Sequence, residues 1–102
     1  MSETLTDEEI EQQNLTDWRV VDGMLRTRWR TGDFATGLRL VNLIGQAAEA
    51  ANHHPDLDLR YPHLDVAMVS HDVGGLTQRD VLLARQISDM AAQEGIVATE
   101  QD

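Results

Sequence analysis

The stretch that decides the fold runs from Phe34 to Ser70 and reads FATGLRLVNLIGQAAEAANHHPDLDLRYPHLDVAMVS. In its first half the apolar residues recur every three or four positions, which is the spacing of an amphipathic helix. That helix, over about 33–52, must end near His53-His54. The reason is Pro55, which disfavours the α conformation in the residue before it.

Beyond the proline, the apolar period changes from three or four residues to two. Strict alternation of apolar and polar residues is the pattern of a strand with one buried face. It predicts half-buried strands over about 57–61 and 64–71. The stretch as a whole therefore predicts a long helix followed by two strands.

The flanking sequence adds two helices and a hairpin. Two short runs, 18–21 and 24–29, contain β-branched or aromatic residues and are separated by Asp22-Gly23, a dipeptide favoured in tight hairpin turns. A short helix with capping-box spacing is expected over about 7–13. A last helix is expected from Thr77, as its cap, to about residue 92.

The element order α-β-β-α-β-β-α predicts an α+β fold in which helices cover one face of a four-stranded antiparallel sheet. We expect a single domain over 1–102 with its core at about 17–94, and the acidic ends, Met1–Asn14 and Gln93–Asp102, as solvated tails. The residues predicted to be buried are Leu38, Val41, Ile44, Leu64, Val66, Met68 and Ile87.

Composition restricts the classes of function. The 102 residues are 41% hydrophobic and 25% charged, which is typical of a globular chain. The net charge of −10 argues against binding to nucleic acid or anionic membranes. No cysteine is present, so disulfides and thiolate chemistry are excluded. The chain has no apolar leader and no membrane-length apolar run, so we expect a cytoplasmic protein. Because so small a core is marginal, we also expect a homo-oligomer.

Three histidines lie at the ends of predicted elements, where sites commonly form. Glu49 and His53 are four residues apart, so on one helix the carboxylate would stack beneath the imidazole and orient it. His54 precedes the proline, and His71 closes a strand. Asp80 lies in the first turn of the last helix, which favours its ionised form.

Two other interpretations of these histidines stay open on the residues alone. The His53-His54 pair suits the carboxyl end of a helix, where a cationic imidazole is favourable. The three histidines with a carboxylate could instead hold zinc or iron, although adjacent histidines lack a characteristic ligand spacing. A fourth histidine, His63, lies in a predicted turn and is expected to be solvated.

The spacing of these residues resembles the signature of the pterin-4a-carbinolamine dehydratases. The signature residues present are Glu49, His53, His54, Pro55, Tyr61, His71 and Asp80, with every gap matched. The resemblance extends weakly upstream and covers about residues 17–94. It implies an enzyme that dehydrates 4a-hydroxytetrahydropterin to quinonoid dihydropterin, without a metal or another cofactor.

The resemblance also implies roles for residues. His53, His54 and His71 would surround the pterin, with His53 and His71 as acid–base groups and His54 for positioning. Glu49 and Asp80 would orient them. The backbone at Ser70 and Asp72 would meet the amide edge of the pterin.

Two positions depart from the family pattern. Leu57 replaces an aromatic residue that is common in relatives. Asn52 replaces an acidic residue beside the paired histidines, which removes a charge that would raise a histidine pKa.

The resemblance leaves alternatives open as well. Implied partners are an aromatic amino acid hydroxylase, as the source of substrate, and further copies of the chain in a dimer or tetramer. The main alternative function is a non-catalytic, protein-binding dimerisation cofactor on the same scaffold. A weaker alternative is an assembly role without any pterin.

Overall fold

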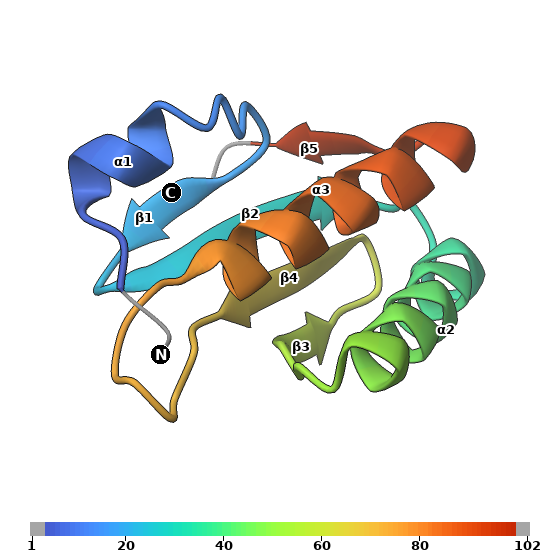
Figure 1. The fold of residues 1–102 in the computed structure, drawn as a ribbon. Coiled ribbons are helices and arrows are strands. Elements are labelled where there is room, and N and C mark those ends of the chain that lie inside the picture. Colours follow the sequence, from blue (N-terminus) through green and yellow to red (C-terminus); the bar gives the residue numbers. More distant parts are fainter. Residues whose placement is uncertain (1–3, 100–102) are drawn as a thin grey trace.

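The computed structural model describes residues 4–99, over which the chain forms helices α1 to α3 and strands β1 to β5. In chain order these are α1 (Asp7–Glu11), β1 (Arg19–Val21), β2 (Met24–Arg30), α2 (Phe34–Ala51), β3 (Asp56–Leu59), β4 (His63–Met68), α3 (Gln78–Gln93) and β5 (Val97–Thr99). Figure 1 shows α2 and α3 together on one face of the sheet. We call this the inner face and the opposite one the outer face.

Every strand pair is antiparallel. The order is β1-β2-β4-β3, and β5 also pairs with β2. The predicted α+β class and the antiparallel sheet with helices on one face are confirmed. The predicted number of strands was one too few, because residues 4–99 form a sheet of five. Since β1 pairs only with Met24–Arg26, the same edge of β2 is open for β5 at Arg28–Arg30.

The predicted hairpin is confirmed, and its turn follows from two residues. Asp22 and Gly23 have φ of 53° and 77°. Positive φ at both central residues gives a two-residue turn whose twist matches antiparallel strands. Val21 and Met24 are therefore directly paired across the turn.

The long helix α2 lies within one residue of its predicted bounds. It begins after Asp33, whose side chain accepts a hydrogen bond from the backbone N–H of Thr36 at 2.8 Å. It packs closely against β3 at Gly37, where a Cβ atom would lie 2.6 Å from the Leu59 side chain. The absence of a side chain at this position lets the helix approach the sheet.

The core lies between the helices and the inner face of the sheet. The predicted core residues that are buried are Ile44, Leu64, Val66, Met68 and Ile87. Val41 is only half-buried, and Leu38 is 46% exposed, so the prediction for Leu38 was wrong. Apolar residues surround much of α2, and the face that meets the sheet is the one with Leu40 and Ile44.

The two ends of the described chain are part of the fold, which corrects the expectation of solvated tails. Ile10 in α1 is 4% exposed, and Ile96 before β5 is 6% exposed. The backbone N–H of Leu5 donates to the carbonyl of Leu76 at 2.7 Å. Charged neighbours conceal these single apolar residues in the sequence. The outermost residues of both predicted tails lie outside the described range.

Over residues 4–99, no helix combines the length and the apolar character that crossing a membrane requires.

Two leucines of α2 provide a matched test of the core. Leu40 is fully buried and Leu38 is 46% exposed. We expect Leu40→Ala to lower the free energy of unfolding by about 2–5 kcal/mol, since it leaves a cavity. Leu38→Ala should change it by no more than about 0.5 kcal/mol. Urea unfolding followed by circular dichroism measures both, and equal losses would show that the face of α2 is wrongly assigned.

Candidate active site

A buried carboxylate connects three elements on the inner side of the sheet. Asp80, in the first turn of α3, is 0% exposed. Its Oδ1 lies 2.6 Å from Nε2 of His53, and its Oδ2 accepts hydrogen bonds from Ser70 Oγ at 2.8 Å and the backbone N–H of Thr77 at 2.9 Å. An ionised carboxylate only accepts hydrogen bonds, so Nε2 of His53 carries the proton in this pair.

Local sequence builds most of this network. Thr77 caps α3 as predicted. The side chain of Asp80, three residues later, accepts a hydrogen bond from the backbone N–H of Thr77, which completes a capping box. Ser70 Oγ also lies 2.8 Å from Thr77 Oγ1. Paired backbone hydrogen bonds between Ser70 and Gly75 hold the intervening turn against the start of α3. The end of β4 and the start of α3 are thereby fixed to each other.

The end of α2 turns His53 into the protein. α2 stops at Ala51, and Asn52 adopts the left-handed conformation with φ 50° and ψ 44°. His53 is then only 7% exposed. The expected stacking of Glu49 on His53 was wrong, because helical spacing does not extend past Ala51. Glu49 instead lies at the surface, with Oε2 2.5 Å from Nε2 of His54.

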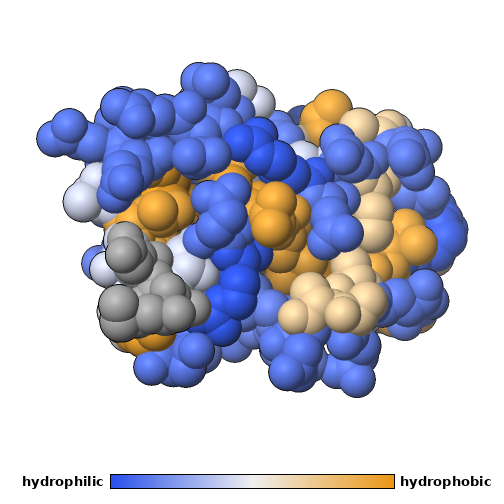
Figure 2. Space-filling view, in the orientation of Figure 1, coloured by the Kyte–Doolittle hydropathy of each residue, from blue (hydrophilic) through white to orange (hydrophobic). Residues whose placement is uncertain are grey.

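His53 lines a hollow of about 390 Å³ between the end of α2 and the side of α3. The lining residues are Ala51, His53, Arg79, Leu82, Leu83 and Gln86. Figure 2 shows hydrophobic residues gathered over the region where α2 and α3 lie beside each other. The lining residues of α3 follow helical spacing, so this signal was present in the sequence. A buried helix face has the same pattern, so the spacing alone does not distinguish residues that line a hollow from residues of the core.

His71 and Asp72 lie in the exposed turn after β4. Ser70 directly precedes them, so the buried network anchors the turn at that end. Asp72 accepts a hydrogen bond from Arg79 Nη2 at 2.7 Å, and this bond lowers the pKa of Asp72. Among the described residues, neither His71 nor His54 is part of the hollow's lining.

The structure thus brings three of the predicted site residues, His53, Ser70 and Asp80, into direct contact. It pairs His54 with Glu49 separately. Within residues 4–99, no three histidine, aspartate or glutamate side chains form a group that could hold a metal ion.

Proton transfer is the chemistry that the His53 imidazole offers. Its Nε2 is occupied by Asp80, whereas its Nδ1 has no hydrogen-bond partner in the described part of the chain. An imidazole held in one tautomer by a carboxylate can exchange a proton at its other nitrogen.

Comparisons with known proteins point to one family. A family model described as "Pterin 4 alpha carbinolamine dehydratase" matches residues 3–90. A protein from Thermosynechococcus vestitus is 40% identical over 89% of this chain and 98% of its own length. One from Mycobacterium tuberculosis is 36% identical over 84% of this chain and 94% of its own. Both carry the name "Putative pterin-4-alpha-carbinolamine dehydratase".

A solved structure is similar in fold as well. It is described as a transcriptional coactivator/pterin dehydratase from Brucella melitensis. The TM-score is 0.81 at 26% sequence identity, covering 87% of this chain and 99% of the other.

The buried network predicts different effects for the same substitution at two aspartates. Asp80→Asn turns an acceptor into a donor that faces other donors, so we expect a loss of about 1–3 kcal/mol in the free energy of unfolding. Asp72→Asn, in an exposed pair, should cost clearly less. Chemical unfolding at one protein concentration compares the two variants, and equal losses would mean that Asp80 does not stabilise the fold through these bonds.

Proposed function

The chain belongs to the pterin 4 alpha carbinolamine dehydratase family, and on that premise we propose that it removes water from 4a-hydroxytetrahydropterins. The products are quinonoid dihydropterin and water. The observation that carries the proposal is the His53–Asp80 pair at the wall of a hollow. Both residues belong to the family signature found in the sequence.

The elimination needs two proton transfers and no change of oxidation state. One proton goes to the hydroxyl on C4a, which leaves as water, and one is taken from N5 of the pterin. Imidazoles suit both steps, because their ordinary pKa lies near neutrality. We assign the transfers to His53 and His71.

The other signature residues are assigned to orientation. Asp80 holds Nε2 of His53, which leaves Nδ1 for the substrate. His54 and Glu49 form a surface pair that we assign to positioning the pterin. The backbone at Ser70 and Asp72 is our candidate for the pterin's amide edge, since the buried network anchors that turn.

This activity has a defined place among reactions. A 4a-hydroxytetrahydropterin forms when a hydroxylase uses tetrahydropterin and oxygen on an aromatic amino acid. We therefore propose that the protein acts after such a hydroxylase, in the recycling of tetrahydrobiopterin.

A second candidate function is non-catalytic binding of another protein. It is favoured by the description of the Brucella melitensis structure, which names a coactivator role beside the dehydratase. A binding module has no need of the three histidines His53, His54 and His71, all of which the dehydratase proposal uses, so we place this candidate second.

The catalytic assignment predicts large losses of rate. We expect His53→Gln or His71→Ala to slow dehydration by about 10²–10⁴-fold, the usual contribution of a general acid or base. Glutamine at position 53 retains an N–H donor for Asp80 and cannot exchange a proton at neutral pH. His54→Ala should raise KM more than it lowers kcat. The measurement is the loss of 4a-hydroxytetrahydropterin in a coupled hydroxylase assay.

His63 supplies the matched control for these variants. It lies in β4 with its side chain on the outer face, 3.8 Å from Asp65, so His63→Ala should leave the rate unchanged. If wild-type protein dehydrates the substrate no faster than buffer does, the enzyme proposal is wrong and the binding module is favoured. Activity that a chelator abolishes and zinc restores would point to a metal site instead.

We also propose that the chain forms a homo-oligomer. Phe34 and Leu38, one turn apart on α2, are 48% and 46% exposed. β3 is last in the order of the sheet and pairs with β4 alone among the described strands, so its other edge is open to a further strand. Light scattering should give a mass well above the 11.4 kDa of one chain at micromolar concentration. A clean monomer would contradict this expectation.

A further inference from the structure

Two neighbouring rows of side chains cross β3, β4 and β2 on the outer face. Within each row the residues lie directly opposite one another on paired strands. The closed row is Asp58, Asp65 and Arg28, and the open row is Asp56, Ala67 and Arg26. The rows therefore differ at the central position on β4, where one has a carboxylate and the other a methyl group.

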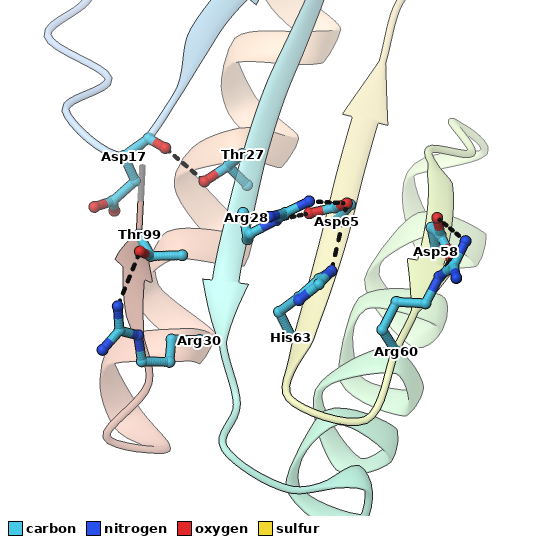
Figure 3. Close-up of polar contacts among 9 residues, drawn as sticks. All are labelled: Asp17, Thr27, Arg28, Arg30, Asp58, Arg60, His63, Asp65 and Thr99. Atoms are coloured by element: carbon cyan, nitrogen blue, oxygen red, sulfur yellow. Dashed lines mark hydrogen bonds and ion pairs between the residues drawn. The ribbon is translucent and has the colours of Figure 1, made fainter. Parts of the chain in front are cut away.

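Every charge of the closed row has a partner within the chain, as Figure 3 shows. Arg28 donates from Nε to Asp65 Oδ1 at 2.7 Å and from Nη2 to Oδ2 at 3.0 Å, a bidentate pair. Asp58 accepts two hydrogen bonds from Arg60, which lower its pKa. Every carboxylate of this row thus has a guanidinium partner within the chain.

The open row lacks these partners. Arg26 donates only a weak hydrogen bond from Nη2 to the sulfur of Met24 at 3.6 Å, and its buried Nε has no acceptor. Ala67, directly opposite, offers no oxygen. In the described part of the chain, neither Arg26 nor Asp56 forms an ion pair. A buried N–H without an acceptor is costly, so the site favours an oxygen supplied from outside.

A hollow of about 210 Å³ is lined by Asp56 and Arg26, the two charged residues of the open row. Its lining residues are Arg26, Thr27, Asp56, Leu57, Asp58, Asp65, Val66 and Ala67. Adjacent strands are about 4.8 Å apart, so the backbones of Asp56 and Arg26 are separated by roughly twice that distance. The small side chain of Ala67 leaves the space between them free.

We propose that the open row binds a small zwitterion, an α-amino acid. The carboxylate of the amino acid would contact Arg26, just as the carboxylate of Asp65 contacts Arg28 in the closed row. Its ammonium group would lie on Asp56. A plain anion suits the hollow less well, because Asp56, Asp58 and Asp65 all line it. This site is on the opposite face of the sheet from the His53 hollow and does not depend on the proposed dehydratase activity.

The test is a titration of the isotopically labelled full chain with L-alanine, followed by amide chemical shifts in nuclear magnetic resonance spectra. We expect saturable shifts centred on Arg26, Ala67 and Asp56. Propionate lacks the ammonium group and ethylamine lacks the carboxylate. Each should bind at least about tenfold more weakly than L-alanine, because each loses one charge-assisted contact.

Matched variants assign the two contacts. Arg26→Gln and Asp56→Asn should each weaken L-alanine binding by about tenfold or more. Arg30→Gln removes the same charge as Arg26→Gln from the same strand and face. Asp72→Asn removes a carboxylate that does not line this hollow, and both variants should leave binding nearly unchanged. Ala67→Asp places a carboxylate opposite Arg26, as in the closed row, and should abolish binding while the chain stays folded.

Several results would overturn the proposal. Propionate that binds as well as L-alanine would reduce the site to a simple anion contact. Absence of saturable shifts at Arg26 would also reject the proposal. Shifts that depend on protein concentration and not on ligand concentration would reject it too, and would indicate contact between copies of the chain. Arg26→Gln should keep the wild-type dehydration rate. Failure of the amino-acid proposal can therefore be distinguished from failure of the dehydratase proposal.

Discussion

The buried carboxylate of Asp80 is the constraint on which the site depends. Removing a carboxylate from water costs several kcal/mol unless hydrogen bonds replace the lost solvation. The replacements come from the end of α2 through His53, from the end of β4 through Ser70, and from the cap of α3. The charge is satisfied only when the end of α2, the end of β4 and the start of α3 meet. The same bonds that satisfy Asp80 orient the imidazole, so stability and the proposed catalysis share one set of contacts.

The two faces of the sheet have separate chemistry because strand residues alternate between them. On β2 the residues Leu25, Thr27 and Trp29 are buried beneath the helices, whereas the arginines between and after them face outward. The net charge of −10 is an average that conceals this arrangement. β2 concentrates cationic side chains opposite the aspartates of β3 and β4, and whether a row closes on itself depends on a single residue of β4.

Most element positions were predictable because each follows from a rule that acts over a few residues. Asp22-Gly23 specifies a tight turn, Pro55 predicts that α2 ends a few residues before it, and Thr77 with Asp80 starts α3. The failures concern contacts between distant parts of the chain. β5 has only three residues and exists because β1 leaves part of the β2 edge unpaired. Leu38 is exposed because the sheet covers a different face of α2.

By itself, the sequence determined the element order, the α+β class and the set of chemically capable residues near His53, since these depend on periodicity, turn chemistry and spacing. Only the tertiary structure decided which carboxylate serves which histidine. His53 and Asp80 are 27 positions apart, and no periodic rule spans that separation. The left-handed Asn52 ended the helical spacing, turned His53 inward to Asp80 and left Glu49 for His54. That choice follows from burial, because Asp80 lies inside the protein and needs a donor, while Glu49 lies in water and does not.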